Sequence, residues 1–243
     1  MVTACLAFAA FCTAVLSGIF GMAGGMILMG VYTALLPVPA AMVMHGGTQL
    51  LSNTTRGFFM RRHVYWRGFC YYLLGALCAF TSLLGVRYTP DPWLVFVGLG
   101  LSPFIAALLP RGWLDFQDSR AAVVTGFQVT AVQLLAGAAG PLLDVAFVDS
   151  KLDRNQVVAT KAVTQVLSHA LKLAYFLPIA ETSGFSPGLV VALLLATLAG
   201  TWLGTGILAR LTDDRFRRYS RRLLLAIGGV YLLQAAMLIL ADG

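Results

Sequence analysis

Long apolar stretches separated by short polar connections run along the whole chain. Several approach or exceed the roughly 20 residues that an α-helix needs to cross a hydrocarbon core. The pattern predicts an all-α polytopic membrane protein. The apolar stretches cover residues 2–36, 39–60, 68–86, 92–110, 121–143, 156–178, 185–209 and 223–241.

The first apolar stretch, residues 2–36, is too long for one crossing and too short for two complete ones. The sequence GMAGG interrupts it at residues 21–25. Glycine permits unusual backbone dihedral angles, which favours a broken or re-entrant helix here. A glycine-rich seam for close helix packing is the alternative interpretation. The stretch also runs far past the length of a signal peptide, so we expect it to be part of the fold.

One offset of 116 residues relates motifs in the two halves of the chain. It carries TQLLSN at 48–53 onto TQVLSH at 164–169, and GMAGG onto GAAGP at 137–141. A single gap-free offset that joins separate motifs is the signature of an internal repeat. The sequence therefore predicts two transmembrane repeats of about 116 residues, 1–116 and 117–243, within one integral membrane domain. A broken or re-entrant helix is predicted at the Gly-rich motif of each repeat, GMAGG and GAAGP.

Equivalent loops of the two halves differ in their basic residues. The loop at 61–67 contains three arginines, whereas its counterpart at 179–187 has no Lys or Arg. The next pair reverses this, with one arginine at 87–91 and six at 210–222. Because short basic loops stay on the cytoplasmic side, equivalent loops are expected on opposite sides. The repeats are therefore predicted to have inverted topology, with a substrate site near the membrane midplane.

Polar residues recur together on one predicted helix of each half. Four of them are spaced by four, four and three residues and so share a helix face, and a Thr and a Ser lie beside it. Such a stripe does not face lipid. The candidate substrate-binding residues are His45, Thr48, Gln49, Ser52, Asn53 and Arg56 in the first half, and Lys161, Thr164, Gln165, Ser168, His169 and Lys172 in the second. The glycine motifs add Gly24, Gly25 and Gly140.

The sign of the charge in these stripes predicts the type of ligand. All ten acidic residues fall in loops or near the ends of apolar stretches. Lys161, Lys172 and Arg56 lie within predicted spans and have no acidic partner at helical spacing. An unpaired buried cation is costly, and a bound anion can offset that cost. Backbone N–H groups at the glycine motifs would add donors for an anion.

Each of these features also has a structural interpretation. Arg56, Lys161 and Lys172 lie close enough to span ends for their charges to reach the interface. The threonines and serines are also typical of interhelical hydrogen bonds. A lone histidine such as His169 is more often a packed polar residue than a proton carrier. The recurrence of all these residues with a glutamine and a basic residue favours a site.

Composition agrees with a membrane protein and argues against a nucleic-acid partner. Hydrophobic residues make up 59% of the chain and charged residues only 11%, well below the charged fraction of soluble domains. The net charge is +7, but six of the seventeen basic residues lie between Arg210 and Arg222. Such a cluster is typical of a segment that faces the anionic cytoplasmic leaflet.

The cysteines predict neither a redox centre nor a metal site. All four lie within apolar stretches, with no CxxC pair and no metal-ligand spacing. We interpret them as small buried hydrophobic residues. They are Cys5, Cys12, Cys70 and Cys78.

Two segments resemble the sulfite exporter family of the TauE/SafE type. The sequence SGIFGMAGGMILMG at 17–30 is similar to the family's first glycine-rich signature, and ATKAVTQVLSHALKLAYF at 159–176 is similar to its second conserved helix. The resemblance implies a small bacterial inner-membrane permease with a duplicated half. It also implies a sulfur-containing anion as substrate, either sulfite or an organosulfonate such as sulfoacetate.

The expected function is a multi-pass secondary transporter for a small sulfur-containing anion, with export as the expected direction. The Gln, Thr and Ser side chains of both stripes would bind the anion's oxygens, and Lys161 would supply charge. No cofactor or metal is expected. Coupling to H⁺ or Na⁺ and a homo-oligomeric state stay open. If the coupling ion is a proton, His169 or His45 is the better carrier because imidazole titrates near neutral pH.

Three other classes of function make different predictions for this sequence. A passive anion channel would use the same scaffold without accumulating its substrate. A non-transporting assembly subunit would have no use for two basic stripes. An intramembrane enzyme is not expected because the chain has no GxSxG or HExxH motif.

Overall fold

The computed structural model describes residues 2–20, 23–86, 88–110, 114–147, 150–180, 186–208 and 213–242. These residues form helices and no β-strand, which confirms the all-α prediction. The helices are α1 (Val2–Phe20), α2 (Ala23–Leu35), α3 (Val38–Phe59), the 3₁₀ helix η1 (Arg61–His63), α4 (Trp66–Val86), α5 (Pro92–Leu108), α6 (Ser119–Ala136), α7 (Gly140–Val145), α8 (Arg154–Phe176), α9 (Pro187–Leu208) and α10 (Asp213–Asp242).

The outer surface of the helix bundle is apolar. Segments of α4, α9 and α10 are long and apolar enough to cross a membrane. Large apolar side chains on these helices point outward, including Trp202 of α9 and Leu240 of α10, both more than four-fifths exposed. An apolar exterior around buried polar residues is the arrangement that a bilayer requires. The chain is therefore a multi-pass membrane protein.

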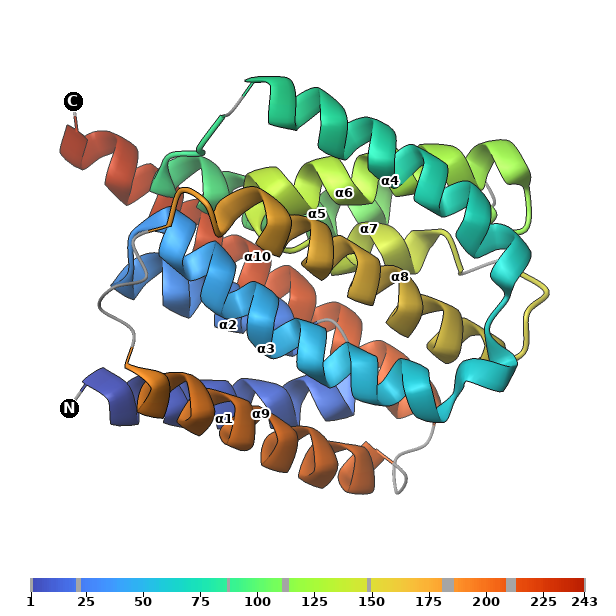
Figure 1. Cartoon of the computed structure of the whole chain (residues 1–243), viewed down its shortest axis with the longest axis horizontal. Helices are drawn as coiled ribbons and strands as arrows, with labels where there is room; N and C mark the ends of the chain where they lie inside the picture. The colour runs from blue at the N-terminus through green and yellow to red at the C-terminus, as the bar shows by residue number, and fades with distance from the viewer. Residues whose placement is uncertain are drawn as a thin grey trace.

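The two polar helices, α3 and α8, pack against each other in the middle of the molecule, between α4 and α6 on one side and α1 and α9 on the other (Figure 1), and most of their residues are buried or half-buried. Gly46 in the first half of α3 lies against Leu173 near the end of α8. Gly57 near the end of α3 lies against Val163 in the first half of α8. The two helices therefore run in opposite directions. This interior position allows both helices to carry polar stripes. Neither stripe has to be solvated by lipid.

The other helices pair across the two halves of the chain. Helix α1 packs on α9, α4 packs on α6, and α5 packs on α10. If the 116-residue offset relates α1–α5 to α6–α10, the α1–α9 pair corresponds to the α6–α4 pair. Figure 1 also shows α1 and α6 running in opposite directions. This is the packing that an inverted repeat would give, and the repeat with its boundary at residue 116 stays a prediction.

The second glycine motif breaks the predicted 121–143 stretch into two helices. Helix α6 ends at Ala136, and Gly137 adopts a left-handed conformation with φ 79° while its N–H bonds to the Gln133 carbonyl at 3.0 Å. Glycine has no Cβ to oppose this conformation. Helix α7 then begins at Gly140. The predicted helix break at GAAGP is confirmed.

The first glycine motif divides the long first stretch in the same way. Helix α1 ends at Phe20 and α2 begins at Ala23; Gly21 and Met22 lie outside the described residues. A Cβ on Gly24 would stand 2.0 Å from the Thr13 carbonyl oxygen. Glycine is therefore required where α2 packs against α1. The alternative interpretation, close helix packing, applies here together with the break.

Two sequence-based expectations about segment ends and cysteines are corrected. Helix α10 begins at Asp213, ten residues before the predicted apolar stretch at 223, so most of the arginine cluster belongs to a helix and not to a loop. Cys70 and Cys78 are exposed on α4 and not buried, since a small thiol is compatible with a lipid-facing surface. Cys12 is half-buried, and the side chain of Cys5 lies outside the described residues.

Candidate functional site

A fully buried lysine joins three parts of the fold. Lys172 of α8 has 0% of its side chain exposed. Its Nζ donates to His45 Nδ1 on α3 at 2.6 Å and to the Gly137 carbonyl oxygen at 2.9 Å. Lys172 therefore links α8 to α3 and to the helix break after α6.

The hydrogen bonds of His45 determine its tautomer. Its Nε2 lies 2.9 Å from the Gly25 carbonyl oxygen. A carbonyl oxygen can only accept, so Nε2 carries the hydrogen and Nδ1 is left as an acceptor for Lys172. The hydrogen-bond chain runs from Gly25 in α2, through His45 and Lys172, to Gly137. It connects the two glycine motifs across the centre of the molecule.

A second imidazole lies beside this chain and is held by an amide. Gln133 Nε2 lies 3.1 Å from His169 Nδ1 and donates to the Gly137 carbonyl at 3.1 Å. The rings of His45 and His169 have centroids 5.4 Å apart. We call Lys172, His45 and His169 the basic cluster.

Gln133 was not among the residues predicted from sequence, although it is fully buried. Two signals could have revealed it. It is an amide in an apolar stretch, one helical turn before Gly137. The 116-residue offset also pairs it with Ser17, another polar residue in an apolar stretch.

Two buried glutamine side chains have unused hydrogen-bonding capacity. Nε2 of Gln165 and Oε1 of Gln133 are buried without a hydrogen-bond partner. The amide of Gln49 lies against Gly25, since a Cβ there would be 3.5 Å from Gln49 Oε1. Buried polar atoms without a partner are uncommon and are often completed by a ligand or water.

The predicted hydroxyl and amide side chains that flank these glutamines are mostly bonded to the protein. Thr48, Asn53 and Thr164 bond to backbone carbonyls of their own helices. Ser52 lies 3.2 Å from the hydroxyl of Thr201 on α9, and Ser168 lies 2.8 Å from the hydroxyl of Tyr72 on α4. The contacts of Ser52 and Ser168 match the interhelical role that was the alternative interpretation.

Lys161 does not supply an unpaired buried charge. Its ammonium pairs with the Asp144 carboxylate of α7, and the two side chains are 23% and 37% exposed. The sequence-based expectation considered acidic partners on the same helix only, whereas α7 brings Asp144 to α8 from a different helix. Lys161 is therefore not the unpaired buried cation that was expected from sequence, whereas Lys172 is fully buried.

The remaining predicted residues divide between the centre and one end of the bundle. Gly24, Gly25 and Gly140 are buried at the two helix breaks. Arg56 is only half-buried in the last turn of α3. It lies eleven residues beyond His45, about 16 Å along the helix axis, and is therefore remote from the basic cluster.

The basic cluster contains three nitrogen bases and no carboxylate. Among the described residues, none of its hydrogen bonds goes to an acidic side chain. The ion pair of Lys161 and Asp144 is separate, eleven residues before Lys172 on α8. An added positive charge on the cluster would therefore be uncompensated by protein, which favours an anionic ligand.

Comparison with known proteins gives one match. The family model described as sulfite exporter TauE/SafE matches residues 6–231, nearly the whole chain. No curated protein and no solved structure gives a significant match. The matched range contains both glycine motifs and every residue of the basic cluster.

Proposed function

The chain belongs to the sulfite exporter TauE/SafE family, whose members are membrane permeases for sulfur-containing anions, and we propose that it moves sulfite or an organosulfonate such as sulfoacetate across the bacterial inner membrane. Export is the proposed direction. The observation that carries the proposal is the buried basic cluster at the junction of the two helix breaks, to which no acidic side chain is bonded within the described part of the chain.

The proposed binding site lies between α3 and α8 beside the basic cluster. Lys172 would provide the positive charge for a sulfonate or sulfite oxygen. Gln165, whose buried Nε2 has no partner, would donate a further hydrogen bond, and Gln49 would add its amide from α3. A tetrahedral or pyramidal sulfur oxyanion presents several acceptor oxygens, and this set of donors suits it.

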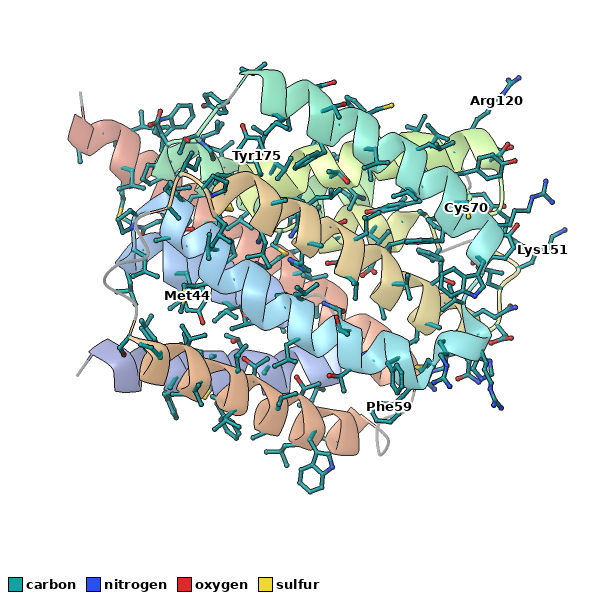
Figure 2. All side chains as sticks on the ribbon, in the orientation of Figure 1. Met44, Phe59, Cys70, Arg120, Lys151 and Tyr175 are labelled. Carbon is teal, nitrogen blue, oxygen red and sulfur yellow. The ribbon has the colours of Figure 1, made fainter. Side chains whose placement is uncertain are left out.

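The charge distribution supports a definite orientation in the membrane. Exposed basic residues gather at one end of the bundle, where Figure 2 labels Arg120 and Lys151. The exposed arginines of η1 lie at the same end, because η1 packs against the start of α8. By the positive-inside rule this end faces the cytoplasm. Residues 2 and 242 lie at the opposite end (Figure 1), which would face outward.

Thermal stability of the purified protein in different salts tests the proposed function first. Sodium salts of sulfite, thiosulfate, sulfoacetate, sulfate, taurine and chloride would be compared. A ligand at 100 times its Kd stabilises the state it binds by about 2.7 kcal/mol. We expect selective stabilisation by sulfite or a sulfonate, and its loss in Lys172→Met. Lys151→Met, which changes an exposed lysine at the basic end, is the matched control and should respond like the wild type.

Uptake into liposomes then separates transport from binding alone. Wild-type protein should move the stabilising anion into the liposomes. With a driving gradient imposed across the membrane, the anion should accumulate inside against its own concentration gradient, which a passive channel cannot achieve. Equal stabilisation by all six salts, or selective binding without any flux, would contradict the proposed function.

A further inference from the structure

The hydrogen-bond geometry of Lys172 and His45 limits how many protons this pair can hold. Lys172 Nζ has two acceptors, His45 Nδ1 at 2.6 Å and the Gly137 carbonyl at 2.9 Å. A neutral amine has two N–H groups, one for each acceptor. His45 uses its Nε2–H on the Gly25 carbonyl. Without an added proton, all N–H groups of the pair are therefore already bonded.

One added proton changes this balance. An ammonium at Lys172 has a third N–H group, and the described residues supply no third acceptor for it. If the proton moves across the 2.6 Å contact to His45 Nδ1, Lys172 still has two N–H groups but only the Gly137 carbonyl as acceptor, so one N–H is left without a partner. A second added proton would place an N–H of Lys172 against an N–H on His45 Nδ1, with no acceptor between them. The pair therefore holds zero or one added proton, and one proton creates one unpartnered N–H.

The described residues around the pair offer no compensating negative charge. Helix α3 contributes Arg56 at its far end, and α8 contributes His169. Helix α2, which packs against α3, contributes the buried hydroxyl of Tyr32, and α4 contributes Tyr72, which is bonded to Ser168. Helix α6 contributes the uncharged amide of Gln133. The titratable residues of η1 are exposed, and so are three of α4: they are Arg61, Arg62 and His63 in η1, and Arg67, Cys70 and Cys78 in α4. The carboxylate of Asp144 in α7 forms an ion pair with Lys161.

We propose that the Lys172–His45 pair is the proton site of the transporter, and that a bound sulfur anion recruits one proton to it. This inference rests on the proposed function. The anion accepts the N–H that the proton creates and neutralises its charge. By linkage, each ligand then favours binding of the other to the same extent.

The coupled step balances in atoms and charge. A proton from water on the entry side binds the amine of Lys172, which becomes an ammonium, and the anion binds the new N–H. No bond of the anion breaks and no electron is transferred. On the opposite side the anion leaves, the ammonium returns its proton to water, and the two hydrogen bonds to His45 and Gly137 are again those of a neutral amine. One anion and one proton cross together, so a monovalent anion crosses without net charge and a divalent anion crosses with one net negative charge.

Proton uptake on anion binding tests this inference with the full-length protein in detergent. Thiosulfate and methanesulfonate serve as probes because, unlike sulfite, they do not titrate near neutral pH. Calorimetry in Tris and Bis-Tris, which are not sulfonates and differ in ionisation enthalpy, gives the number of protons taken up per anion. We expect about one proton per bound anion in the wild type. Lys151→Met should give the same value.

Lys172→Arg separates charge from proton exchange. Its guanidinium stays protonated, so this variant should bind the probe with no proton uptake. The wild-type value decides the inference by itself, so a variant that fails to fold does not affect the decision. Anion binding by the wild type without proton uptake would overturn the inference and leave the proposed function standing. No binding of any anion in the thermal panel would overturn the proposed function, and this inference with it.

Discussion

Replacing Gln133 by leucine removes the amide that holds both the Gly137 carbonyl and His169. The carbonyl keeps its bond from Lys172, but Nδ1 of His169 loses its Gln133 partner. Hydrogen bonds between helices in a membrane contribute about 0.6 kcal/mol on average and about 1.7 kcal/mol at most. A buried group left without a partner costs about 1–3 kcal/mol. We therefore expect Gln133→Leu to lower the free energy of unfolding by about 1–3 kcal/mol.

A double-mutant cycle measures the part of this loss that belongs to His169. Gln133→Leu, His169→Leu and the double variant would be unfolded reversibly in mixed micelles, with Gln128→Leu as the control on the same helix, since Gln128 is only half-buried. We expect a coupling energy of about 0.6–1.7 kcal/mol between Gln133 and His169, and a change below about 0.5 kcal/mol for Gln128→Leu. Zero coupling, with the two single losses simply additive, would refute the hydrogen-bond assignment.

Three further changes test other parts of the structure. Lys161→Met should lower the free energy of unfolding by less than about 1 kcal/mol and leave anion affinity unchanged, because the ion pair of Lys161 with Asp144 is partly exposed. A tenfold weaker affinity in a binding titration would show that Lys161 belongs to the binding site. Gly126→Val should destabilise the fold by about 1–3 kcal/mol or more, because a Cβ at Gly126 lies 2.0 Å from a backbone oxygen of α4; unfolding at wild-type denaturant concentration would contradict that packing. In intact cells, a membrane-impermeant maleimide should label Asp91→Cys and not Lys151→Cys, and the reverse pattern would invert the proposed orientation.

The positions of most helices could be predicted from sequence because the period and length of apolar stretches carry that information directly. The break at GAAGP was also predictable, since Gly137 is the residue that can adopt φ 79° at low cost. The start of α10 was not predictable in this way. Its first turns are rich in arginine, and hydropathy identifies the end of an apolar stretch but not the end of a helix that continues into the interface.

The candidate site residues could be chosen from sequence, but the contacts between them could not. The 116-residue offset pairs His45 with Lys161, whereas the structure pairs His45 with Lys172. An offset identifies equivalent positions, and antiparallel packing of α3 on α8 brings non-equivalent positions together. The offset likewise gives no indication that Asp144 neutralises Lys161, because that contact depends on where the short helix α7 lies. Helix packing decides which lysine is buried.

A structure of the protein with bound thiosulfate would show whether Lys172 contacts the anion. We expect density for the anion between α3 and α8, with an oxygen or sulfur within about 3.5 Å of Lys172 Nζ and the Gln165 amide turned toward it. The same data collected from Lys172→Met should lack this density. Anion density confined to the exposed arginines at the basic end, with none beside Lys172, would contradict the account.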